Sequence, residues 1–338
     1  MEREEGGGGE VSRAVGVLRG APLLCAAALV AASAASLAQQ GYPSRPIRIV
    51  VPSSAGGGID IVARVAAPRL AERLGQQVLI DNRPGAGTMI GSELVARAPA
   101  DGYTLLMSAA PLSINPAIYK KLPYEALRDF APITLAASYP NVLVVHPSLP
   151  VASVQQLIAF ARARPGQLSY GSAGIGTNPH FAMELFRSMA KLDLVHVPYK
   201  GSAPAVIDLV AGHVQLMAGT MITVIPHVRS GRLRALAVSS ARRAAAAPEL
   251  PTIAESGLPG YEAIQWYGLL APAQTPKEIV ARLHDELVRV LQLPDVKAKI
   301  AEDGGDPVGD TPEEFARFMR ADTEKWAKLA RVAGIKPE

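Results

Sequence analysis

The sequence VPSSAGGGIDIVARV at residues 51–65 joins an apolar strand to an amphipathic helix through three consecutive glycines. The run IRIVV before it predicts a buried strand, and from Ile59 apolar residues recur at helical spacing. A glycine turn lets a bound group approach bare backbone, and the N–H groups that begin a helix attract anions. We therefore expect an anion at this turn.

Strand-like and helical segments alternate along the rest of the chain, which predicts an α/β fold with a largely parallel sheet. A loop rich in proline and asparagine is expected after YTLLM at 103–107. Thr311 and Glu314 form a capping-box pattern that predicts the start of the last helix. Helices are expected over residues 59–74, 88–98, 153–164, 178–190, 203–211, 276–291 and 311–333.

The 338 residues are enough for two lobes, yet no proline-rich or glycine-rich linker divides the chain. We therefore expect a chain that crosses between two lobes more than once. The apolar runs NVLVVHPS at 141–148 and IQWYGLLAP at 264–272 are candidate crossover strands. The expected lobe one covers 42–141 plus 267–338, and lobe two covers 142–266.

The N-terminus predicts an export signal over residues 1–38, because two arginines precede an apolar run that ends in Ser-Leu-Ala. A membrane anchor is the alternative, but the run is shorter than the ~20 apolar residues of a spanning helix. A lipid on Cys25 is a further alternative, disfavoured by the bulky Leu24 before it. Cys25 is the only cysteine, so the processed chain has none, which suits a bacterial periplasm.

The glycine turns do not match nucleotide-binding motifs. A P-loop needs a lysine after its last glycine, where this chain has Ile59 and Thr177. The dinucleotide fingerprint needs a later glycine where Ile90 and Pro179 stand. We expect no nucleotide and no other cofactor.

Hydrolase catalysis, metal binding and nucleic-acid binding are also disfavoured. Ser172 lies in GSAG, which is not a nucleophile elbow, so no catalytic residue is expected. The six histidines lack the spacing of a helical zinc site, and no metal is expected. The formal net charge of +4 is scattered and does not predict nucleic-acid binding.

A second stretch, YGSAGIGTNPH at 170–180, repeats the plan of strand, glycine turn and helix. NRPGAGTMIG at 82–91 and VPYKGSAPAV at 197–206 are similar. In α/β sheets ligands bind beyond the carboxyl ends of strands, where helices begin. Two such loops facing each other across a cleft would hold an anion between backbone N–H groups. His180 either contacts that ligand or makes a structural hydrogen bond.

Long stretches carry a family resemblance: YPSRPIRIVVPSSAGGGIDIVAR at 42–64, VLIDNRPGAGTMIGSELVARAPADGYTLL at 78–106, and LPTIAESGLPGYEAIQWYGLLAPAQTPKEIV at 250–280. From Tyr42 onward the chain resembles the Bug, or TctC-like, solute-binding receptors of tripartite tricarboxylate transporters. The resemblance implies a type II periplasmic-binding-protein fold, with two Rossmann-like lobes joined by crossover strands around a ligand cleft. It implies a monomeric receptor, not an enzyme, that delivers a carboxylate to membrane permease subunits.

The resemblance also implies where the carboxylate binds, with lobe-one loops opposing lobe-two loops. The corresponding residues are Ser53, Ser54, Ala55, Gly56, Gly57, Ser108, Ala109, Ala110, Ser172, Ala173, Gly174, Gly176, Thr177, Asn178, His180, Tyr199, Lys200, Gly201, Ser202, Gly219 and Thr220.

Two departures from the family pattern bear on the ligand. Ser53 and Ser54 stand where relatives commonly have Phe and Ala, which implies a more polar pocket. Ala218 and Gly219 replace a common Phe-Asp pair, whose acid can meet an amino group. The hypothesis is a di-, tri- or aromatic carboxylate without an amino group. Two alternative functions remain: a receptor that signals to a sensor kinase, and an exported enzyme on the same fold.

Four residues near these loops have simple structural interpretations. Asp60 is expected to complement the dipole of its helix. Trp266 and Tyr267 are expected to pack the hinge rather than line the cleft. Lys200 either pairs with a distal carboxylate or is an ordinary exposed lysine.

Overall fold

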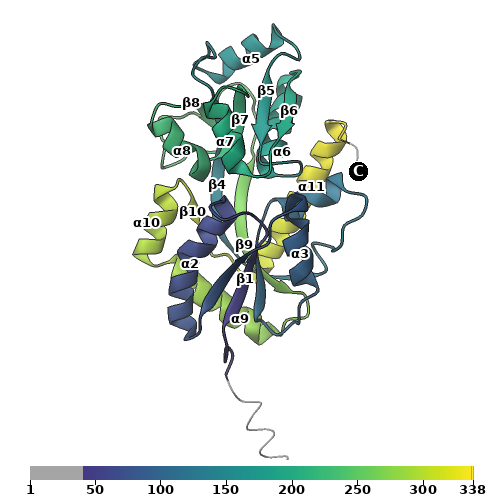
Figure 1. The fold of residues 1–338 in the computed structure, drawn as a ribbon, viewed down its shortest axis with the longest axis vertical. Helices are drawn as coiled ribbons and strands as arrows, with labels where there is room; N and C mark the ends of the chain where they lie inside the picture. Colours follow the sequence, from purple (N-terminus) through teal and green to yellow (C-terminus); the bar gives the residue numbers. More distant parts are fainter. Residues whose placement is uncertain (1–40, 336, 338) are drawn as a thin grey trace, which may run out of the picture. The chain divides into compact units, whose positions relative to one another are not determined.

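The computed structural model describes residues 41–335 and 337, and the chain from Arg45 onward forms one compact unit (Figure 1). The predicted export signal lies outside the described residues. The strands are β1 (Ile47–Val51), β2 (Val78–Asn82), β3 (Thr104–Ala109), β4 (Phe130–Val145), β5 (Ser169–Ser172), β6 (Val195–Pro198), β7 (Leu216–Thr220), β8 (Arg234–Val238), β9 (Ile264–Pro272) and β10 (Asp306–Pro307).

The helices alternate with these strands as the sequence predicts. They are α2 (Gly58–Leu74), the short 3₁₀ helix η1 (Ala86–Thr88), α3 (Met89–Ala96), α4 (Pro111–Ile118), α5 (Val154–Arg162), α6 (Asn178–Ala190), α7 (Ser202–Val210), α8 (Met221–Arg229), α9 (Lys277–Leu291), α10 (Pro294–Glu302) and α11 (Pro312–Val332).

The sheet has the order β2-β1-β3-β9-β4-β7-β5-β6, and its direction changes in the middle. β1 runs parallel to β2 and β3, and β5 runs parallel to β6 and β7. β9 is antiparallel to β3 and β4, and β4 is antiparallel to β7 and β8. The prediction of a largely parallel sheet is therefore wrong for the centre, because the strands that pass between the lobes run against their neighbours.

β4 changes partners at one point along its length. Up to Pro140 it pairs with β9, and from Asn141 it pairs with β7. Figure 1 shows β4 and β9 passing between two groups of elements, one around β1, α2 and α9 and the other around β5, α6 and α7. We call these groups lobe one and lobe two. The lobe boundaries given above remain a prediction.

Local sequence explains the helix ends. α2 buries Ile59, Val62 and Ala66 on one face and ends at Gly75, whose φ of 67° is left-handed. The predicted capping box of α11 is confirmed: Thr311 Oγ1 accepts from the Glu314 N–H at 3.2 Å, and Glu314 Oε2 accepts from the Thr311 N–H at 2.9 Å.

Three helices were not predicted, namely α4, α8 and α10. The expected loop after YTLLM is instead α4, with Pro111 at its first turn and Pro116 inside it. An internal proline removes a helix hydrogen bond. In α4 that loss is offset by burial, since Leu112 and Ile114 are fully buried and the helix packs on α11.

The core continues through both lobes. Trp266 is fully buried, donates its indole N–H to Asp322 at 2.9 Å, and meets Phe315 edge to face. Phe181 on α6 meets Trp326 on α11 in the same geometry. The packing interpretation of Trp266 is confirmed.

Candidate functional site

The glycine loop at 53–57 is held by a buried carboxylate. Asp60, 2% exposed, accepts the Gly56 N–H at 2.8 Å and the Asn82 amide N–H at 3.0 Å. Arg64 pairs with the same carboxylate at 2.9 Å. Burial acts to raise the pKa of Asp60, but the hydrogen bonds from Arg64, Gly56 and Asn82 outweigh it and lower the pKa below its usual value. Asp60 therefore fixes the loop as well as sitting in the first turn of α2.

The three glycines meet different structural needs. Gly56 has a φ of 77°, which side-chain-bearing residues rarely adopt. A Cβ at Gly57 would lie 3.2 Å from the Ser54 carbonyl oxygen. At Gly58 a Cβ would overlap the hydroxyl of Tyr267. The bare backbone thus admits a tyrosine from β9 beside the start of α2.

Two of the predicted donors are already engaged inside the loop. The Gly56 N–H donates to Asp60, and the Gly57 N–H donates to the Ser54 carbonyl at 3.2 Å. α2 has no side-chain N-cap, and the first N–H groups of a helix have no partner within it. The first turn of α2, beginning at Gly58, therefore offers backbone donors to an anion.

The lobe-two loop is tied to itself and to the turn after β6. Ser172 Oγ lies 2.7 Å from His196 Nε2 and accepts the Gly174 N–H at 3.2 Å. The Tyr199 N–H donates to the Ser172 carbonyl at 3.1 Å, and the Gly201 N–H donates to the Ala173 carbonyl at 3.0 Å. The structure therefore brings together two of the predicted site segments.

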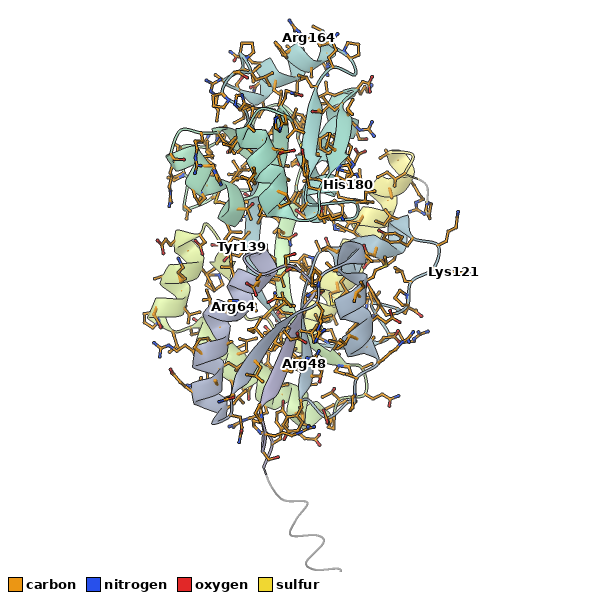
Figure 2. The ribbon with its side chains drawn as sticks, in the orientation of Figure 1. Arg48, Arg64, Lys121, Tyr139, Arg164 and His180 are labelled. Atoms are coloured by element: carbon orange, nitrogen blue, oxygen red, sulfur yellow. The ribbon has the colours of Figure 1, made fainter. Side chains whose placement is uncertain are left out.

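His180 belongs to a stack of rings in lobe two, near its junction with lobe one (Figure 2). Its ring centroid lies 4.1 Å from that of His196, which lies 4.8 Å from that of Tyr170. Burial, with smaller contributions from His196 and Arg187, lowers the pKa of His180 to about 3. Burial likewise lowers the pKa of His196 to about 4. Both imidazoles are uncharged at neutral pH, so His180 supplies no positive charge.

Other predicted site residues differ in exposure. Lys200 is exposed, as an ordinary surface lysine would be. The rest divide into the buried residues Ser108, Ala109, Ala110, Gly176, Asn178, Gly219 and Thr220, the half-buried residues Ser53, Thr177 and Ser202, and the exposed residues Ser54 and Ala55.

The lobes meet where the predicted loops lie. A Cβ at Gly176 in lobe two would lie 3.0 Å from Asn115 Oδ1 and closer still to Ile118 Cδ1, both on α4 of lobe one. A Cβ at Gly58 would lie 3.6 Å from Ile222 Cγ2, near the start of α8. The two glycine loops thus lie at contacts between the lobes.

Tyr267 was expected only to pack the hinge. It is 2% exposed and meets Tyr139 edge to face at 5.5 Å, which confirms the packing. Its hydroxyl also reaches the first residue of α2. Burial raises the pKa of this phenol, so it stays protonated and can donate a hydrogen bond. The antiparallel register of β9 on β3 pairs Tyr267 with Ala109. The sequence alone gave no sign of the contact with Gly58.

Among the described residues, ten buried side-chain polar atoms have no hydrogen-bond partner, and Ser53 Oγ and Ser108 Oγ are two of them. Buried hydroxyls are usually paired with protein, water or ligand. The two serines lie in the lobe-one loops predicted to hold the carboxylate, which supports a polar ligand there.

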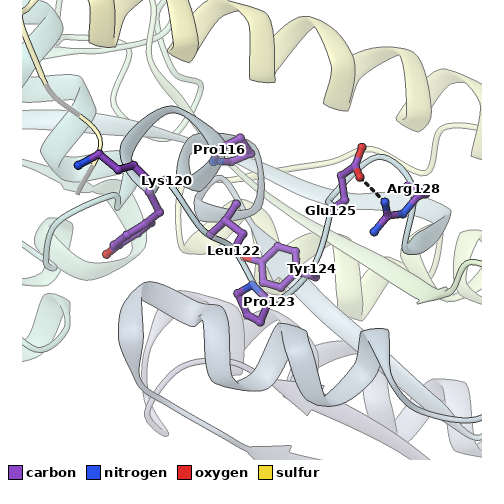
Figure 3. A pocket seen from close by; sticks show the side chains of 8 residues that line it. Pro116, Lys120, Leu122, Pro123, Tyr124, Glu125 and Arg128 are labelled. Carbon is purple, nitrogen blue, oxygen red and sulfur yellow. Dashed lines mark ion pairs between the residues drawn. The ribbon is translucent and has the colours of Figure 1, made fainter.

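A pocket of about 330 Å³ lies elsewhere on lobe one, after α4, and its lining includes Lys120, Tyr124 and Arg128 (Figure 3). Arg128 pairs with Glu125 in its wall. None of its lining residues belongs to the predicted site.

Sequence comparison decides the family. Residues 62–335 match the model of the tripartite tricarboxylate transporter family receptor, TctC. The chain belongs to the TctC, or Bug, family. Protein BugT of Bordetella pertussis is 39% identical over 305 residues, covering 90% of this chain and 94% of BugT. The family consists of periplasmic solute-binding receptors with two lobes.

Two solved structures of TctC-type proteins carry ligands. R. palustris Rpa4515 with adipate is 40% identical, with a TM-score of 0.85, covering 88% of this chain and 100% of that one. MatC from Rhodopseudomonas palustris with bound malate is 30% identical, with a TM-score of 0.80, covering 85% and 99%. Both ligands are dicarboxylates without an amino group. In residues 41–335, no helix has the length and apolar character needed to cross a membrane.

Proposed function

We propose that this TctC-family chain is a periplasmic receptor that captures a small carboxylate without an amino group and delivers it to the permease of a tripartite tricarboxylate transporter. The observation that carries the proposal is the pair of glycine loops, each leading into a helix without a side-chain cap, at a contact between lobes. Such helix starts bind anions through backbone N–H groups. The bound adipate and malate of the relatives support the same ligand class.

The charges around the loops support the absence of an amino group. The carboxylate nearest the first loop, Asp60, is buried and already bonded to Arg64, Gly56 and Asn82. Gly219, where relatives commonly carry an acid, has no side chain, and the space of its Cβ is filled by Val224. Nothing in these two positions would balance an ammonium group.

A thermal-shift panel of mono-, di-, tri- and aromatic carboxylates tests the proposal. A ligand at 100 times its Kd should stabilise the folded protein by about 2.7 kcal/mol. Gly57→Val should abolish most of that shift, because its side chain would crowd Ser53 and Ser54 without backbone strain, φ at Gly57 being −77°. Gly41→Ala, which meets nothing within 4 Å, is the control. No shift with any carboxylate contradicts the proposal.

A further inference from the structure

A buried group of polar side chains lies where β4 changes partners. Asn141 and Ser239 are fully buried, and Asn178 is 1% exposed. The backbone carbonyls of Ala263 and Ile264, at the start of β9, complete the group. Buried amides are costly unless they are hydrogen-bonded, so their presence here calls for a role.

The bonds of this group are short and connected. Asn141 Nδ2 donates to Asn178 Oδ1 at 2.6 Å and to the Ala263 carbonyl at 3.0 Å. Asn178 Nδ2 donates to the Ile264 carbonyl at 2.9 Å. Ser239 Oγ accepts the Asn141 N–H at 2.7 Å and donates to the Ala263 carbonyl at 2.5 Å.

The three partners of the Asn141 side chain belong to different elements, and two of them are predicted site residues. Asn178 is the first residue of α6, directly after the Ser172–Thr177 loop. Thr220, at the end of β7, donates its hydroxyl to Asn141 Oδ1 at 3.4 Å. Ala263 and Ile264 lead into β9, which pairs with the lobe-one half of β4. One side chain thus joins two predicted ligand segments to both crossover strands.

The chemistry of the amide suits this position. The amide NH₂ of Asn141 donates to two carbonyl oxygens, and its Oδ1 accepts from a hydroxyl. An aliphatic or ionised acidic side chain of similar size cannot make this set of bonds. Connected buried hydrogen bonds hold their members in one arrangement. Asn178 follows the N-cap residue Thr177, and its side chain bonds Asn141 and the Ile264 carbonyl.

We propose that Asn141 is a positioning residue for the ligand site: it fixes the first turn of α6, and the loop before it, against the crossover strands before ligand arrives. It does not touch the carboxylate. The expected effect of Asn141 on ligand affinity rests on the proposed function. The ordering of the loop by Asn141 does not.

Hydrogen exchange of the ligand-free full-length protein tests the ordering. Asn141→Ala and Asn178→Ala should each speed exchange of amides in residues 172–180 by ~10-fold, with α7 unchanged. Ser239→Ala is the matched control, since it removes two bonds of the same group but none to α6. If Asn141→Ala fails to fold, the exchange rates of Asn178→Ala alone test the proposal. Unchanged exchange at 172–180, or equal acceleration in Ser239→Ala, overturns the proposal.

Calorimetric titration with adipate tests the consequence for binding. Asn141→Ala should weaken adipate binding ~10-fold, and Ser239→Ala should weaken it less than twofold. The double variant Asn141→Ala, Asn178→Ala should bind adipate no more weakly than either single variant, because the two residues act as a unit. Equal weakening in Asn141→Ala and Ser239→Ala contradicts the positioning role. If adipate does not bind the wild-type protein, the same titrations use the carboxylate with the largest thermal shift in the panel. If no carboxylate binds, the proposed function fails, and the hydrogen-exchange result alone tests the positioning role of Asn141.

Discussion

At the scale of single residues, the glycine loop is held in place by the carboxylate of Asp60. Asp60 bonds the Gly56 N–H and pairs with Arg64. Asp60→Asn should lower the free energy of unfolding by about 1–3 kcal/mol, because a charge-assisted hydrogen bond is lost in a buried place. Urea denaturation measures it. Asp295→Asn, which breaks the exposed pair with Arg69, should cost less than about 1 kcal/mol.

The sign of the pH dependence follows from the lowered pKa of Asp60. Its stabilising contribution is present above the unfolded pKa near 3.8 and is lost as pH falls through the lower folded value. The difference between wild type and Asp60→Asn should therefore shrink only below pH 3.8. A constant difference down to lower pH would contradict this account of the loop.

The histidine stack predicts a loss of stability on acidification in a higher pH range than Asp60 does. The folded pKa of His180, about 3, lies below its ordinary value of 6.5. The unfolded chain therefore binds a proton first as pH falls, and stability decreases below pH 6.5. His180→Phe should remove about 2 kcal/mol of the stability lost between pH 7 and 5, measured by urea midpoints. An unchanged pH slope would contradict this account, because it would show that the pKa of His180 is the same in the folded and unfolded chains.

At the scale of elements, the start of α2 and the middle of β9 fit each other. Gly58→Ala should destabilise the protein by about 1–3 kcal/mol, because its Cβ would overlap the Tyr267 hydroxyl. Adding Tyr267→Phe should recover part of that loss, measured by thermal unfolding of the double variant. Gly41→Ala should be neutral. If Tyr267→Phe gave no recovery in the Gly58→Ala background, the two elements would not be in the proposed contact.

Sequence patterns predicted elements where local signals were strong. The spacing of apolar residues in α2 and α6 and the capping box of α11 gave their positions closely. α4 was missed because prolines at 111 and 116 indicate a loop locally, while burial against α11 decides the conformation. Helix formation there depends on contacts with residues some two hundred positions away, which no local window contains.

At the scale of the whole molecule, the two crossovers were predicted from their apolar, proline-bounded sequences. Their antiparallel direction was not predicted, since alternation of strands and helices favours a parallel sheet. The loops at 53–57 and 172–178 were predicted from their glycines, whereas the segment 108–110 was predicted only from the family resemblance. The role of Asn141 was not predicted from the sequence. An asparagine between a proline and an apolar run gives no indication of hydrogen-bond partners 37 and 122 residues away.

The central claim is that the cleft binds a carboxylate held by backbone donors and hydroxyls, with no group to balance an ammonium. The most direct measurement is calorimetric titration of the purified protein with the carboxylate that gives the largest thermal shift in the panel and with its 2-amino analogue, which differs only in the amino group. The account predicts at least ~100-fold weaker binding of the amino analogue, as expected for burying an unpaired charge. Equal or tighter binding of the amino analogue would contradict it.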